Sequence, residues 1–216
     1  SSPLPELGEG LGVRVLNLDT YLETALPLKR GRLLKRLRKL TMNMKKAYEV
    51  AALAVRQRLE EQNPQALAIL NRIKQKDVAV YPGTFDRVED ILDCLKVPKT
   101  LKPKPKKLQA RIIFVNCSNS YDKSLSSELS DQVNQEKWLV SSDWALGNFL
   151  ETAFPNRVRW NQKSTRDEVI SVEPNLNSLW SDVVVLGADP QWWLETSSHP
   201  IEILNPEAVT IEAASH

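Results

Sequence analysis

Cysteine and histidine are scarce in this chain of 216 residues, which has two of each. Cys94 and Cys117 are too few for a disulfide framework, and with His199 and His216 they do not provide the ligand cluster of a structural zinc site. We therefore expect no metal and no cofactor.

Long apolar runs are also missing. No stretch approaches the roughly 18 apolar residues that span a bilayer, and the first residues, SSPLPELGEG, lack the basic and apolar regions of a signal peptide. The composition, 42% hydrophobic and 26% charged, is ordinary for a globular protein. We expect a cytoplasmic location.

Charge is distributed unevenly along the chain. Residues 1–107 contain 22 Lys/Arg and 12 Asp/Glu, whereas residues 108–216 contain 7 and 15. A basic front end suits an acidic partner, nucleic acid or a lipid surface, or it packs against the acidic half.

The first third of the chain predicts an arm followed by helices. Residues 1–28 are rich in proline and glycine and predict the arm. Asn63 and Pro64 are typical of an N-cap followed by proline in the first turn, and they divide residues 29–75 into a basic helical hairpin. Apolar residues spaced by three or four positions predict the first, long helix: Leu33, Leu37, Leu40, Met44, Ala47, Ala51, Val55 and Leu59.

Residues 76–216 alternate short apolar segments with amphipathic ones. This alternation predicts an α/β fold, with a mostly parallel sheet and helices on both faces. The predicted strands are 77–81, 110–117, 138–140, 181–188 and 199–205, with edge strands at 157–160 and 168–172. The predicted helices are 86–95, with Phe85 on its inner face, 126–133 and 144–154.

Three segments resemble a known superfamily: VAVYPGTFDRVEDILDCLKVP, RIIFVNC and KWLVSSDWALGNFLETAFP. In order and phrasing they are similar to the class I glutamine amidotransferase-like superfamily, and within it to trehalose-utilisation-type (ThuA-like) proteins. The resemblance covers about residues 77–205 and implies a flavodoxin-like sheet.

The chain departs from that superfamily at the catalytic positions. The resemblance implies a cysteine between glycines at the turn after a strand, where this chain has Ser142, Asp143 and Trp144. The late histidine and acid would be His199 and Glu202, at a different spacing. The resemblance therefore implies the domain without its catalytic cysteine, and a histidine without a thiol has nothing to activate.

Ligands of doubly wound sheets bind at the carboxyl ends of the strands. Asp143 is there either a nucleophile or general base, or an N-cap of the helix that begins at Trp144. Four polar loops, 81–84, 116–119, 141–144 and 189–192, are expected to meet at this edge. The predicted rim comprises Tyr81, Asn116, Ser118, Asp143, Trp144, Asp189 and Trp192.

Other candidates at this rim have two interpretations each. Cys117 is a nucleophile or a buried core residue. Ser118 or Ser142 as a nucleophile needs a positioned base, for which His199 is the only histidine within residues 77–205. Five tryptophans form an aromatic binding surface or fill the core: Trp144, Trp160, Trp180, Trp192 and Trp193.

Residues 29–46, KRGRLLKRLRKLTMNMKK, contain nine basic residues and no acidic one. Such a run is the solvated face of a helix, or it contacts phosphates, an anionic membrane or an acidic protein. The lack of aromatic residues disfavours nucleic acid, and the apolar stripe favours a protein partner or self-association through residues 29–62. The predicted contacts are Arg32, Lys35, Arg36, Arg38, Lys39, Lys45 and Lys46.

These observations favour a non-catalytic binding or assembly module, in which a degenerate amidotransferase-like domain is joined to a basic helical segment that contacts a partner. The alternative is a hydrolase or sugar-processing enzyme that uses Ser142, Asp143 and His199. A third interpretation is one domain of a larger protein.

Overall fold

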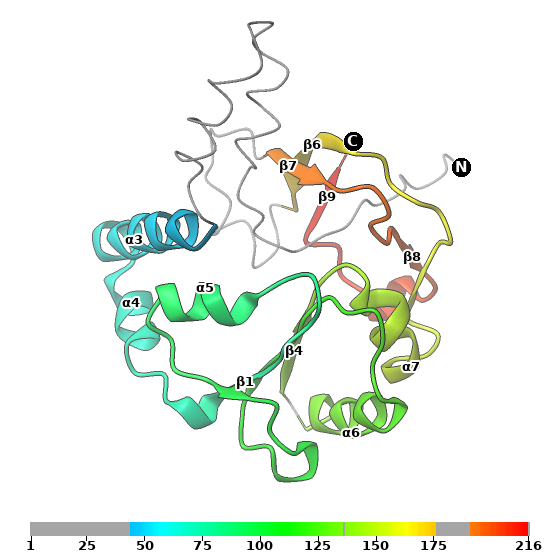
Figure 1. Cartoon of the computed structure of the whole chain (residues 1–216), viewed down its shortest axis with the longest axis horizontal. Coiled ribbons are helices and arrows are strands. Elements are labelled where there is room, and N and C mark those ends of the chain that lie inside the picture. The colour runs from blue at the N-terminus through cyan, green and yellow to red at the C-terminus, as the bar shows by residue number, and fades with distance from the viewer. Residues whose placement is uncertain (1–43, 136, 176–190, 216) are drawn as a thin grey trace, which may run out of the picture. The chain divides into compact units, whose positions relative to one another are not determined.

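The computed structural model describes residues 44–135, 137–175 and 191–215 (Figure 1). They belong to two compact units: residues 44–73 with 90–97 are helical, and residues 74–89 with the described part of 98–215 form an α/β unit. The predicted arm, the start of the predicted hairpin and the predicted strand 181–188 lie outside the described residues.

The helical unit is built from α3 (Met44–Gln62), α4 (Pro64–Leu70) and most of α5 (Val88–Cys94). The predicted cap is confirmed, because Asn63 Oδ1 accepts a hydrogen bond from the Ala66 N–H at 3.0 Å. Arg56 of α3 donates to Asn71 Oδ1 and, at 3.0 Å, to the carbonyl of Leu95. One guanidinium thus joins three segments of this unit.

A parallel four-stranded sheet forms the centre of the α/β unit, in the order β2-β1-β3-β4. Its strands are β1 (Val78–Tyr81), β2 (Thr100–Leu101), β3 (Ile112–Val115) and β4 (Trp138–Ser141). All four residues of β1 are buried, as expected for a central parallel strand. In β4, at the sheet edge, Trp138 is 62% exposed. The chain therefore has a mixed α/β fold.

Helices follow the strands of this sheet. They are α6 (Lys123–Val133), the π-helix η3 (Leu146–Leu150) and α7 (Glu151–Ala153). Asp122 caps α6 by accepting from the Ser124 N–H at 2.9 Å, so this helix begins three residues before its predicted start. Phe149 and Leu129 from these helices pack with Ile113 and Val115 of the sheet in one buried cluster.

The later strands pair antiparallel, in two further sheets. β5 (Val158–Trp160) pairs with β8 (Ile201–Ile203), and β6 (Glu168–Pro174) lies between β7 (Gln191–Leu194) and β9 (Ala213–Ser215). β5 is an edge strand, as predicted for 157–160, although in a separate antiparallel pair, whereas the prediction that 168–172 is an edge strand is wrong, because β6 has a strand on each side. The partly exposed side chains of β5 and β6 suit antiparallel strands, which tolerate one face in water.

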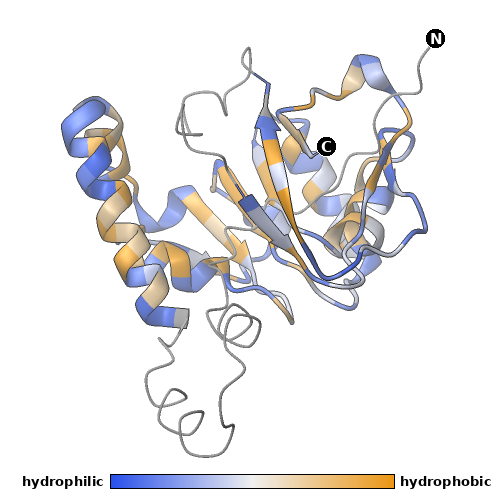
Figure 2. Cartoon of the chain, turned by 90° about the horizontal axis from the view of Figure 1, so that it is seen from above, coloured by the Kyte–Doolittle hydropathy of each residue, from blue (hydrophilic) through white to orange (hydrophobic). Residues whose placement is uncertain are grey.

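The described residues also include three short 3-10 helices: η1 (Gln75–Asp77), η2 (Pro105–Lys107) and η4 (Pro206–Ala208). Within the described part of the chain, no helix has the length and apolarity needed to cross a membrane. Along α3, polar and apolar residues lie side by side (Figure 2). Val50 and Leu53 of this helix are 59% and 67% exposed.

Candidate functional site

The polar loops at the carboxyl ends of β1, β3 and β4 form the candidate site. β1 and β3 are neighbours although β2 lies between them in sequence, so the strand order reverses at this pair. A reversal of this kind is where α/β sheets bind ligands. We call residues 82–86, 116–121 and 142–144, with His199, the strand-end rim.

Gly83 allows the first two loops to meet. A Cβ at this position would lie 1.9 Å from the carbonyl oxygen of Cys117, so no side chain fits. The same oxygen accepts hydrogen bonds from the N–H groups of Thr84 and Phe85, at 2.8 and 3.3 Å. Glycine is needed here because two backbones approach closely.

Asn116 is buried, with 3% of its surface exposed. Its Nδ2 donates to Glu89 Oε2 at 2.9 Å and to the carbonyl of Asp86 at 3.4 Å. The amide that was predicted to face a ligand therefore connects the end of β3 to the segment after β1.

Asp143 occupies the turn after β4 with φ at 44°, a left-handed backbone that is uncommon for residues other than glycine. Its Oδ1 accepts a hydrogen bond from the His199 backbone N–H at 2.9 Å. Its Oδ2 lies 3.9 Å from Cys117 Sγ, which donates weakly to it. The carboxylate thus connects three loops that are distant in sequence.

Ser142 donates its hydroxyl hydrogen to Asp86 Oδ2. A serine nucleophile instead needs its hydroxyl on a base such as imidazole. The structure therefore brings Ser142 to a carboxylate of the first loop rather than to His199.

The His199 side chain lies in an aromatic stack. It is 7% exposed, and its ring is nearly parallel to those of Trp144 and Trp160, with centroids 5.4 and 4.2 Å away. Among the described residues neither ring nitrogen has a hydrogen-bond partner, and the buried Nδ1 faces Gly147. His199, the predicted base, is therefore held by ring stacking and not by a hydrogen bond from its imidazole to a described residue.

Burial lowers the pKa of His199 below its ordinary value, while the carboxylates of Asp143 and Glu151 oppose that shift. A neutral imidazole suits its position between two indole rings, without a hydrogen-bond acceptor beside Nδ1 in the described residues. Protonation would place a charge in a buried environment.

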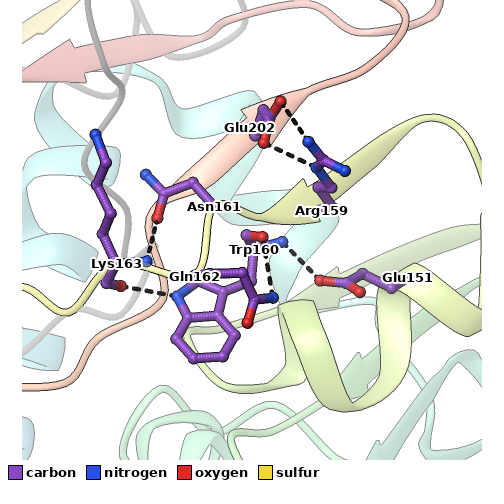
Figure 3. Close-up of polar contacts among 7 residues, drawn as sticks. All are labelled: Glu151, Arg159, Trp160, Asn161, Gln162, Lys163 and Glu202. Atoms are coloured by element: carbon purple, nitrogen blue, oxygen red, sulfur yellow. Dashed lines mark hydrogen bonds and ion pairs between the residues drawn. The ribbon is translucent and has the colours of Figure 1, made fainter.

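Both tryptophans of the stack are anchored by polar contacts. Trp144 donates from Nε1 to the carbonyl of Ser197 at 2.7 Å. The backbone N–H of Trp160 donates to Glu151 Oε1 at 2.6 Å, and its Nε1 donates to the carbonyl of Lys163 at 2.9 Å (Figure 3). The stack therefore has defined positions on both sides of the histidine.

Phe85 extends the stack at the Trp144 end, with ring centroids 5.2 Å apart in an edge-to-face arrangement. It is 52% exposed, so its predicted place on the inner face of a helix is wrong. The reason is that α5 begins only at Val88, which leaves Phe85 in the loop.

Glu202, the late acid implied by the resemblance, faces a different partner. It lies opposite Arg159 in the β5–β8 pair, and the two side chains form a bidentate contact at 2.8 and 2.9 Å (Figure 3). The guanidinium holds the pKa of Glu202 below its ordinary range. This carboxylate is paired on an exposed ribbon.

Tyr121 belongs to the rim although no sequence pattern pointed to it. Its hydroxyl is buried and has no hydrogen-bond partner in the described part of the chain. Burial raises its pKa, with further contributions from Asp86 and Cys117. Asp86 was missed as well; a carboxylate in the segment that follows the first strand was the available signal for it.

The other candidates have varied positions. Cys117 is 1% exposed, which fits the core interpretation. Ser118 Oγ lies 3.2 Å from Thr84 Oγ1, and its carbonyl accepts from Asn148 Nδ2 at 2.7 Å. Tyr81 donates its hydroxyl hydrogen to the Pro103 carbonyl at 2.8 Å, and burial raises its pKa to about 12.

Trp192 lies in β7, where it pairs with Ile170, so its predicted loop is a strand. Lys45 and Lys46 are exposed in α3. No group of three or more His, Cys, Asp and Glu side chains within the described ranges is placed to hold a metal ion. Six predicted site residues lie outside the described residues: the partner contacts Arg32, Lys35, Arg36, Arg38 and Lys39, and the rim residue Asp189.

Comparison with protein-family models, curated proteins and solved structures finds no match to this chain. At the rim, hydroxyl, amide and carboxylate groups are mostly bonded to one another, and the imidazole is held between indole rings. This arrangement fixes loops, and within the described residues it lacks a serine or cysteine bonded to a histidine.

Proposed function

We propose that this chain is a non-catalytic binding or assembly module. It combines an α/β domain, a degenerate relative of the amidotransferase-like superfamily, with a basic helical segment that contacts a partner. The parallel order β2-β1-β3-β4 supports a flavodoxin-like sheet. The observation that carries the proposal is the use of Asp143, at the position of a nucleophile, as a structural link between His199 and Cys117.

Catalysis by this rim would need groups that are differently arranged. A nucleophile is activated by a base within hydrogen-bond reach. Ser142 is bonded to Asp86, and the nitrogens of the His199 ring are without a partner in the described residues. The geometry therefore supports binding over turnover.

The surface of α3 supports a partner. Val50 and Leu53 lie one turn apart and are 59% and 67% exposed, with Lys45 and Lys46 exposed one turn earlier. An apolar pair flanked by charge on a helix suits a second helix that covers it. We propose self-association through this surface.

An activity assay tests the non-catalytic part. The full chain, Ser142→Ala and Cys117→Ala proteins are incubated with glutamine and with a p-nitrophenyl ester, and product is followed over time. We expect all three to match the uncatalysed rate. Hydrolysis by the full chain that either substitution abolishes would contradict the proposal.

Sedimentation velocity over a range of concentrations tests the assembly part. We expect the full chain to associate and the Val50→Glu/Leu53→Glu protein to sediment as a monomer. Gln62→Glu/Gln65→Glu adds the same charge at exposed positions and serves as the control. A full chain that stays monomeric, or an equal effect of both double substitutions, would refute self-association through α3.

One observation favours the alternative, a hydrolase or sugar-processing enzyme using Ser142, Asp143 and His199. The left-handed backbone of Asp143 is strained, and strained residues gather at active sites. The same activity assay, extended to glycosides and to Asp143→Asn protein, decides between the two. Turnover that depends on Asp143 would establish the enzyme.

A further inference from the structure

The loop between β2 and β3 presents a concentrated positive charge. Residues 102–107 read KPKPKK, and all four lysines are exposed. We call these residues the lysine loop. Lys106 comes within 3.7 Å of Glu128, but its side chain is 82% exposed. In the described residues, no ion pair involves Lys102, Lys104 or Lys107.

The backbone of this loop is fixed although its side chains are not. The Lys102 N–H donates to the Val80 carbonyl at 2.9 Å, and the Tyr81 hydroxyl donates to the Pro103 carbonyl at 2.8 Å. Pro105 begins the 3-10 helix η2, which contacts α6. Proline and these contacts already limit the movement of the backbone. The loop therefore loses less conformational entropy when a partner binds.

An anionic partner must also avoid the acidic surroundings. Residues 108–216 hold 7 Lys/Arg and 15 Asp/Glu. On α6, which packs beside η2, Glu128 and Asp131 come close to any long polyanion that lies across the loop. Six residues span at most about 20 Å, so a short segment meets the lysines without meeting the rest of the acidic domain.

The loop also adjoins an apolar contact point. Leu101, the last residue of β2, is 53% exposed directly before Lys102. Lysine supplies a point charge without the planar geometry or ring stacking that base recognition uses. The combination suits a peptide that carries both carboxylates and an apolar side chain.

From these observations we propose that the lysine loop binds a short acidic segment of a protein, with glutamate or aspartate side chains at the four lysines and an apolar residue at Leu101. This surface goes beyond the proposed function, which rests on α3 and the strand-end rim. Binding weakens as salt rises, because all of its ion pairs are exposed.

Fluorescence anisotropy tests the proposal with the full chain. The probe is a short fluorescein-labelled peptide that alternates glutamate with alanine and carries one leucine. The test variant is Lys102→Gln/Lys104→Gln/Lys106→Gln/Lys107→Gln. The control, Lys76→Gln/Lys96→Gln/Lys123→Gln/Arg166→Gln, removes the same charge from exposed positions elsewhere. Circular dichroism confirms that both variants fold.

We expect the test variant to lose affinity by at least about tenfold, and the control to change it much less. No peptide binding, or an equal loss in both variants, overturns the proposal. A duplex oligonucleotide and vesicles containing phosphatidylserine are measured in parallel. Tighter binding of either one through the same lysines would also overturn it, since the partner would then be an extended polyanion.

Discussion

The strand-end rim and the lysine loop are both polar parts of the α/β unit, but their polar groups have opposite environments. At the rim, Ser142, Asp143 and Asn116 each have a partner in another segment of the same chain. In the lysine loop the backbone is bonded, whereas the four lysine side chains are exposed. Residue type alone does not distinguish a binding group from a structural one.

This difference assigns separate tasks to the two regions. Buried polar groups that are bonded to one another make the fold specific and cost stability when one is removed. Exposed charges contribute little to the fold and remain available for a partner. Substitutions at the rim should therefore change stability, and substitutions in the lysine loop should change binding.

The largest expected effect is at Gly83. Gly83→Ala brings a methyl group against the Cys117 carbonyl, and both are backbone positions that cannot turn aside. We expect the free energy of unfolding to fall by about 3 kcal/mol, measured by urea denaturation. At Gly147 an added methyl group would lie 3.3 Å from its nearest neighbour, His199 Nδ1. Gly147→Ala is the control, with a change of about 1 kcal/mol or less.

A Gly83→Ala protein as stable as the control would show that the two loops separate without cost. The rim would then be adaptable, and its contrast with the lysine loop would disappear. The paired substitutions make this outcome distinct from a general effect of adding methyl groups.

The next largest effect is at Asp143. Asp143→Ala leaves the His199 backbone N–H without its charged acceptor and keeps a left-handed backbone that alanine tolerates poorly. We expect a loss of about 2 to 3 kcal/mol. Asp143→Asn retains an oxygen acceptor and the tolerance for this backbone, so its loss should be about 1 kcal/mol or less. If the unchanged chain and both variants were equally stable, Asp143 would have no structural role.

Local patterns in the sequence were enough to predict several elements. The apolar runs mark β1 and β3, because buried parallel strands contain few polar residues, and a shorter run marks β4 at the sheet edge. Asn63 followed by Pro64 marks a cap whose bond closes within three residues. In each case the cause lies within the segment itself.

Contacts between distant segments were not predictable in the same way. β5 pairs with β8 across about forty residues, and nothing local to either strand names its partner. Ser142 and His199 were recognisable as candidates from the sequence, but their orientation depends on Asp86 and on two tryptophans. The need for glycine at position 83 arises from Cys117, which lies in another loop.

The pH dependence of stability tests the aromatic stack. Burial places the pKa of His199 below its unfolded value of 6.5, so the unfolded chain binds the proton more readily. Its contribution to stability is complete above that value and is lost as the pH falls through the folded pKa. Asp143 and Glu151 are the carboxylates that oppose the shift.

His199→Phe keeps a ring in the stack and removes the titration. We expect its unfolding free energy, measured by urea denaturation between about pH 7 and about pH 5, to fall less than that of the unchanged chain. A steeper fall in the variant would mean that the imidazolium is stabilised by the indole rings and carboxylates. The rim would then hold a charge, as the lysine loop does.

The smallest expected effect is on the thermal stability of the lysine-loop variant. It tests the contrast between the strand-end rim and the lysine loop most directly. The chain with Lys102, Lys104, Lys106 and Lys107 changed to glutamine should keep its melting temperature within about 2 °C. These side chains are exposed, and neutralising neighbouring like charges removes repulsion as well as the contact with Glu128. Differential scanning calorimetry measures the change. A fall comparable to that of Asp143→Ala would mean that the lysines support the fold, and their availability to a partner would no longer follow from their exposure.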